Sequence, residues 1–136
     1  MARVVKVNLA QARERAGLAR EHLQIAHERL EMCRARPERS PEAQAAASNA
    51  VLAAIAASDA LCGHALGERA ADQDHGTATT LIKTVQPDGV RLANKLRRLL
   101  SDKTLLQYGT YCTPVTAEQA VRDAKVLVDA LDSRGL

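Results

Sequence analysis

An unbroken apolar seam near the N-terminus constrains the fold more than any other feature of the sequence. Between Leu9 and Cys33, apolar residues recur at spacings that alternate between three and four. This pattern is typical of a long helix that packs against other helices along one side. The predicted helix covers about residues 7–36 and would be about 45 Å long, at 1.5 Å per residue. A chain of 136 residues must fold back along this helix to cover the seam.

The second predicted helix has clear signals at both ends. Ser40 followed by Pro41 is typical of an N-cap and a first helical residue. Gly67 predicts the end of the helix after Leu66. This segment is apolar almost all round, so we expect it to be the central helix of the fold.

Two further helices are predicted in the middle of the chain. Residues 67–76 are polar and predict a loop. The next segment predicts a short helix that carries Leu81, Ile82 and Val85. Pro87 should break this helix and start a fourth one, which ends near Gly109.

The last predicted helix begins at Thr113 and Pro114, another cap followed by proline, and Thr116 with Gln119 resembles a capping box. No segment shows the alternation that predicts a strand. The sequence therefore predicts an all-α fold, an antiparallel up-and-down bundle of four main helices plus one short helix. We expect one domain over residues 1–136.

The composition argues against several classes of protein. The chain contains no Trp and no Phe, so its core must be built from aliphatic residues and Ala. Cys33, Cys62 and Cys112 are widely spaced, which argues against a disulfide framework or a structural zinc site. The apolar run over residues 51–57 is too short to span a membrane. We therefore expect a cytoplasmic protein with reduced thiols, no cofactor, no metal and no membrane contact.

Four stretches, in this order, resemble the HEPN superfamily of helical-bundle proteins over residues 50–131. They are the central helix AVLAAIAASDALCGHALG, the loop DQDHG leading into TATTLIKTV, the Leu-rich segment LANKLRRLLSDKTLLQYG and the final helix TAEQAVRDAKVLVDAL. Many HEPN proteins are metal-independent ribonucleases, often toxins or defence effectors, that act as dimers. The resemblance thus implies a HEPN-like bundle, association with RNA and a homodimer or another protein partner.

The resemblance also indicates where a catalytic pair would lie. In the family, an Arg, four to six other residues and a His stand near the end of the penultimate helix. This sequence has Lys103 in place of the Arg and Tyr108 in place of the His. An unperturbed Tyr has a pKa near 10 and Lys lacks the two-pronged phosphate contact of Arg, so the usual cleavage chemistry is not implied. Alternatively, Lys103 is a solvated helix residue and Tyr108 closes one end of the bundle.

A basic helix face is the best candidate for contact with phosphate. Arg91, Lys95 and Arg98 are spaced by four and three residues, so they share one side of the fourth predicted helix. The mild net charge of +3 permits contact with nucleic acid but does not require it. The alternative is an ordinary solvated face beside an apolar stripe.

Asp59 interrupts the most apolar helix and must find partners if it is buried. His75, in the following loop, is one candidate partner and a backbone donor is another. We interpret the residues as a structural polar contact; the alternative is an acid–base pair. Arg69 and His75 also match the family's spacing, but their place in a loop before the short helix indicates a chance match.

Three functions are compatible with these features. The favoured one is a non-catalytic HEPN-like interaction module that dimerises and binds RNA or nucleotide phosphate through the basic helix face. The second is a metal-independent ribonuclease with an altered motif formed by Lys103 and Tyr108. The third is a purely structural or antitoxin-like role.

Overall fold

Helices form most of the structure, a computed structural model that describes residues 3–101 and 110–136. The helices are α1 (Leu9–Cys33), α2 (Pro41–Leu66), α3 (His75–Lys83), α4 (Gly89–Ser101) and α6 (Pro114–Asp132). Two short strands, β1 (Val4–Lys6) and β2 (Glu68–Ala70), pair with each other.

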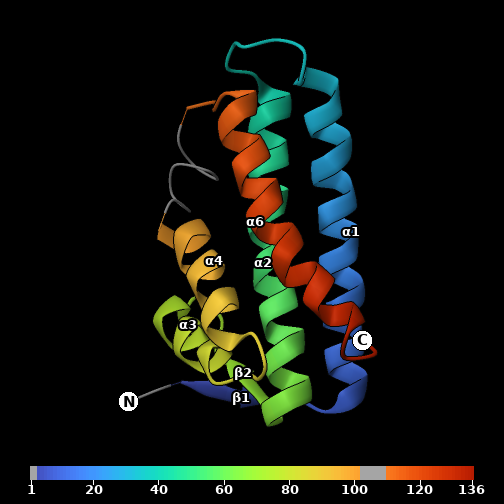
Figure 1. Ribbon diagram of the computed structural model, residues 1–136, viewed down its shortest axis with the longest axis vertical. Coiled ribbons are helices and arrows are strands. Elements are labelled where there is room, and N and C mark those ends of the chain that lie inside the picture. The colour runs from blue at the N-terminus through green and yellow to red at the C-terminus, as the bar shows by residue number, and fades with distance from the viewer. Residues whose placement is uncertain (1–2, 102–109) are drawn as a thin grey trace.

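The long helices run up and down beside one another (Figure 1). Helix α2 returns along α1, and α6 lies across α2 while also contacting α1 and α4. Helices α3 and α4 pack together beside the lower half of α2. The predicted helical bundle, with four long helices and one short one, is thus confirmed in its main features for the described residues.

The apolar seam of α1 is covered inside the chain. Every seam residue from Ala12 to Cys33 is buried, whereas Leu9 at the start is about half exposed. The helix starts later than predicted because Asn8 caps its N-terminus, in a capping box with Gln11, and it ends earlier, at Cys33. Since α2 and α6 cover the seam, it is not available as a surface for a second molecule.

Helix α2 begins and ends as predicted. The side chain of Ser40 accepts a hydrogen bond from the Ala43 amide, and Gly67 ends the helix in the left-handed conformation, with φ of 72°. Contrary to the expectation from the short apolar run, α2 as a whole is long and apolar enough to cross a membrane. In its most apolar 18-residue stretch, however, 72% of the residues are buried in the bundle, as in the core helix of a soluble fold.

The small sheet contradicts the expectation of no strands and of a loop throughout residues 67–76. Val4 pairs with Ala70 and Lys6 with Glu68, in an antiparallel register. Strands of three residues are too short to show alternation, and their pairing partners lie far apart in the sequence. Local patterns therefore could not reveal them.

Gly63 is the point of closest approach between α2 and the N-terminal segment. A Cβ atom there would lie 2.6 Å from Cγ1 of Val7, the buried residue directly after β1. Only glycine leaves enough room for this contact.

The first residues of the two helices in the middle of the chain also differ from the prediction. Helix α3 begins at His75, where Asp74 caps it, rather than after Gly76. Helix α4 begins at Gly89 and not at Pro87, because the Asp88 carbonyl accepts the first helical hydrogen bond from the Leu92 amide. The expected end of this helix near Gly109 lies outside the described residues.

Helix α6 begins at Pro114 with Thr113 as its N-cap, as predicted. The predicted capping box was wrong in its residues. The Thr116 amide donates to the Thr113 hydroxyl, and the Gln119 side chain donates to Asp123 instead of returning to the helix start. Thr116 therefore lies inside the helix rather than at its cap.

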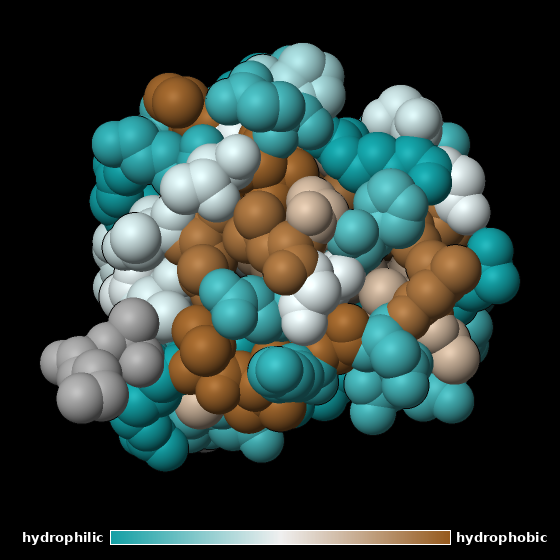
Figure 2. Space-filling view, turned by 90° about the horizontal axis from the view of Figure 1, so that it is seen from below, coloured by the Kyte–Doolittle hydropathy of each residue, from teal (hydrophilic) through white to brown (hydrophobic). Residues whose placement is uncertain are grey.

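The lower end of the bundle exposes apolar surface (Figure 2). In Figure 1 this end holds β1, the start of α1 and the end of α2. The large apolar residues exposed in these elements are Val4, Val5, Leu9 and Leu66, which we call the lower apolar end.

Candidate functional site

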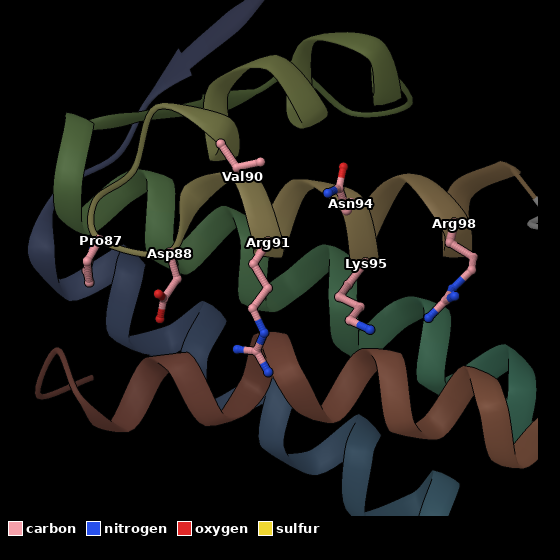
Figure 3. Close-up of a pocket in the computed structure, with 7 residues that line it drawn as sticks. All are labelled: Pro87, Asp88, Val90, Arg91, Asn94, Lys95 and Arg98. Atoms are coloured by element: carbon pink, nitrogen blue, oxygen red, sulfur yellow. The ribbon is translucent and has the colours of Figure 1, made fainter.

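The basic side of α4 is the first candidate site. Arg91, Lys95 and Arg98 point to the same side of the helix, towards α6 (Figure 3), and we call these three residues the α4 face. Another side of the same helix buries Leu92 and Leu96 completely. The buried leucines hold α4 on the bundle and so determine which way the three cations point.

A buried carboxylate on α6 orients two of these cations. Asp123 is only 2% exposed. Its Oδ2 accepts a hydrogen bond of 2.8 Å from Arg98 Nε, and its Oδ1 accepts a second from Arg98 Nη2. Lys95 Nζ lies 3.8 Å from Oδ1, and Gln119 donates to the same oxygen at 3.2 Å. The Arg98 guanidinium is therefore held in a fixed, two-pronged geometry while half of its side chain stays exposed.

Arg91 differs from the other two cations of the α4 face. Among the residues that the structure describes, no carboxylate lies within ion-pair distance of its guanidinium. It lines a surface depression of about 630 Å³ together with Lys95 and Arg98. The remaining lining residues are Pro87, Asp88, Val90 and Asn94. Positive charge thus dominates a hollow that is large enough for a phosphate group.

The other predicted pair, Lys103 and Tyr108, lies outside the described residues. Helix α4 is described as far as Ser101, and the description resumes at Thr110.

A second candidate site is a cavity of about 290 Å³ between α1, α2, β2 and α3. Arg15 of α1, Asp59 of α2, Arg69 of β2 and His75 of α3 all line it, and we call it the Asp59 cavity. Leu52, Ile55, Ala70, Ala71 and Ala78 contribute an apolar lining. The structure thus brings Asp59 and His75 to one cavity. It brings Arg69 there as well, although the place of Arg69 and His75 before the short helix indicated that their match to the family's spacing arose by chance.

The charged groups around this cavity differ in how well they are satisfied. Arg69 donates to the carboxylate of Asp72 at 3.0 Å and to the carbonyl oxygen of Ala70 at 2.9 Å. Asp74 accepts hydrogen bonds from the amide and hydroxyl of Thr77, as a helix cap does. These contacts explain the structural roles of Arg69 and Asp74.

Asp59 is the exception among these charged groups. It is 8% exposed, and its one ion pair within the described chain is with Arg15, at 4.0 Å between Nη1 and Oδ2. Burial raises the pKa of the carboxyl to about 6, and the charges of Arg69 and Arg15 only partly oppose this rise. Asp59 is therefore a buried acid that ionises close to neutral pH.

Two important residues were not predicted from the sequence. Asp123 stands between Ala120 and Leu127 at spacings of three and four, so its place on the apolar side of the last helix was visible in the sequence. Arg15 gave no such signal, because nothing local marks one arginine of α1 among several.

The described residues contain no cluster of three or more His, Cys, Asp or Glu side chains that could hold a metal. All three cysteines are buried and are not in disulfides. Burial raises the pKa of the Cys62 thiol to about 12, which makes it a poor nucleophile.

Comparison of the chain with family models, with curated proteins and with solved structures gives no match.

Proposed function

We propose that this chain is a non-catalytic, HEPN-like interaction module that binds phosphate groups of RNA or of a nucleotide through the α4 face. The observation that carries the proposal is the alignment of Arg91, Lys95 and Arg98 along one side of α4, above a single depression. From Arg91 to Arg98 the helix rises about 10 Å. This length suits a chain of phosphates better than one small anion.

The contact with Asp123 supports a binding role for Arg98. A long flexible cation loses conformational entropy when it binds a ligand, and this loss weakens binding. Asp123 has already ordered the guanidinium of Arg98 in the free protein. Arg91 would add a two-pronged contact and Lys95 a point charge between them.

Salt dependence of RNA binding tests the proposal. Three phosphate contacts on single-stranded RNA predict a slope of about −2 for the logarithm of the association constant against the logarithm of salt concentration. Fluorescence anisotropy with a labelled single-stranded RNA measures this slope. Arg91→Ala should weaken binding and make the slope shallower by about 0.7, because one phosphate contact is lost.

Arg13→Ala is the matched control, since Arg13 is exposed on α1, far along the chain from the α4 face, and the change in net charge is the same. If both variants weaken binding equally, attraction depends on overall charge and the α4 face is not a site. If the wild-type protein binds no RNA and no nucleotide, the proposal is wrong.

We also propose that self-association of the module uses the lower apolar end. Val4, Val5, Leu9 and Leu66 are each 39–48% exposed, whereas the α1 seam is buried. Sedimentation velocity of the wild-type protein and of Val5→Asp tests this. A wild-type dimer that Val5→Asp converts to a monomer supports the proposal, and a wild-type monomer rejects it.

Metal-independent cleavage of RNA through Lys103 and Tyr108 is the competing function. Incubation with structured RNAs in EDTA, beside a Lys103→Ala/Tyr108→Ala double variant, separates the two. If the wild-type protein cleaves RNA and the double variant does not, the chain is a ribonuclease and not a binding module.

A further inference from the structure

The Asp59 cavity contains a donor and an acceptor that do not satisfy each other. Nη1 of Arg15 and Oδ2 of Asp59 are 4.0 Å apart, beyond the usual hydrogen-bond length of about 2.7–3.2 Å. In the part of the chain that the structure describes, neither side chain makes a hydrogen bond of its own. The Asp59 side chain is nevertheless about nine-tenths buried. Since Asp59 lines the cavity, a ligand that displaces solvent there must supply hydrogen-bond donors to this carboxylate.

The two groups determine which atoms a ligand must present side by side along one edge. The ligand must offer an N–H to Asp59 and, beside it, an oxygen to Arg15. A single trans peptide group points its N–H and its carbonyl in opposite directions, so one such amide cannot serve both Asp59 and Arg15. A cis amide within a ring, called a lactam, presents both side by side.

Size and polarity restrict the ligand further. A volume of about 290 Å³ accommodates one ring system, close to the lower limit of about 300 Å³ for small-molecule pockets. Leu52, Ile55 and Ala78 offer apolar contact to the faces of a planar ring. Of the other charged groups that line the cavity, Arg69 pairs with Asp72, and Asp74 caps α3. The remaining charges, Arg15 and Asp59, balance each other, so a neutral ligand is favoured over a cationic one.

We propose that the Asp59 cavity binds a nucleobase with a ring N–H beside a carbonyl oxygen, as in guanine, hypoxanthine and uracil. The ring N–H donates to the Asp59 carboxylate, and the carbonyl oxygen accepts from the Arg15 guanidinium. Guanine also has an exocyclic amino group for the second carboxylate oxygen, so it should bind tightest. Adenine and cytosine offer Asp59 only an amino N–H, which stands beside a ring nitrogen instead of a carbonyl oxygen, so they give the carboxylate one hydrogen bond where guanine gives two. The proposal concerns a surface separate from the α4 face and does not depend on phosphate contacts.

Nucleosides without phosphate test the proposal directly. Isothermal titration of the full chain at pH 7.5, where Asp59 is ionised, compares guanosine, inosine, uridine, adenosine and cytidine. Guanosine should bind about tenfold to a hundredfold more tightly than adenosine, the range expected for a lost hydrogen bond to a charged group. Binding of no nucleoside, or equal binding of all five, would overturn the proposal.

Two variants locate the binding within the protein. Asp59→Asn should weaken guanosine binding at least tenfold, and Arg15→Gln should weaken it less, because Arg15 is about one-third exposed. Asp129→Asn and Arg13→Gln are the matched controls on exposed parts of α6 and α1. If a folded Asp59→Asn protein and a folded Arg15→Gln protein both bind guanosine like the wild type, the cavity is not the site.

The experiment also separates this proposal from the one for the α4 face. Arg91→Ala should leave guanosine binding unchanged, and Asp59→Asn should leave the salt slope of RNA binding unchanged. Guanosine binding without salt-dependent RNA binding would reject the α4 proposal alone, and the reverse result would reject the nucleobase proposal alone.

Discussion

Asp123 and Asp59 are two buried aspartates on neighbouring helices, and their surroundings differ greatly. Asp123 accepts two hydrogen bonds from Arg98 and one from Gln119, with Lys95 close by. Asp59 has one loose ion pair with Arg15 at 4.0 Å. Similar burial therefore does not imply a similar role. A satisfied carboxylate holds two helices together, whereas an unsatisfied one beside a cavity is available to a ligand.

The largest expected effect comes from disturbing the position of α4, which carries one side of the Asp123 contact. A Cβ atom at Gly89 would lie 2.3 Å from the Lys83 carbonyl oxygen. Because backbone cannot move aside cheaply, Gly89→Ala should destabilise the fold by about 3 kcal/mol. Gly63→Ala, beside the Asp59 region, should cost only about 1–2 kcal/mol, because the clash there is with the Val7 side chain.

Urea unfolding followed by circular dichroism measures both glycine variants. A loss for Gly89→Ala as small as the one expected for Gly63→Ala would show that α4 can shift without strain and that its position is not fixed by this contact.

The second prediction compares Arg98, which contacts Asp123, with Arg15, which lies near Asp59. Arg98→Met should lower the free energy of unfolding by about 2 kcal/mol, because it leaves Asp123 buried with weaker partners; this is less than for a fully buried pair, since Arg98 is half exposed. Arg15→Met should change it by less than about 1 kcal/mol, because the pair with Asp59 is long and partly solvated. Thermal unfolding of the two variants at one pH measures the difference. A larger loss for Arg15→Met would reverse the comparison.

The third prediction is a gain in stability. The pKa of Asp59 is about 6 in the folded protein, above its ordinary value of 3.8, so the folded state binds more protons between these pH values. Stability from this group is present below pH 3.8 and is lost as the pH rises through about 6. The loss corresponds to about 3 kcal/mol at most. Asparagine does not ionise, so Asp59→Asn removes this loss of stability. The variant should therefore be more stable than the wild type by about 1–2 kcal/mol at pH 8.

Unfolding experiments at pH 4 and at pH 8 check this prediction. The advantage of Asp59→Asn over the wild type should be larger at pH 8, and Asp129→Asn should show no such change. A loss of stability at pH 8 would mean that the Asp59 carboxylate has stronger partners than Arg15.

The helix boundaries show how far local signals reach. Ser40, Pro41 and Gly67 predicted both ends of α2, because caps depend on a few neighbouring residues. The same reasoning placed α6 correctly at Pro114 but assigned its capping box to the wrong residues, because Gln119 donates to Asp123 within the helix. Local rules identify the donors and acceptors near a helix end, and tertiary contacts decide which of them pair.

By itself, the sequence determined the helical bundle, the buried side of α1 and the central place of α2. These features follow from periodicity and caps, which act over one or two turns of helix. It also placed Arg91, Lys95 and Arg98 on one side of α4, for the same reason.

Only the tertiary structure decided the β1–β2 pairing, the contact of Arg98 with Asp123 and the convergence of Arg15, Asp59 and His75 on one cavity. Each joins residues from different elements, so it depends on how the helices pack and not on any local pattern. The burial that raises the pKa of Asp59 has the same origin, because neighbouring elements exclude water from a carboxylate that an isolated helix would leave hydrated.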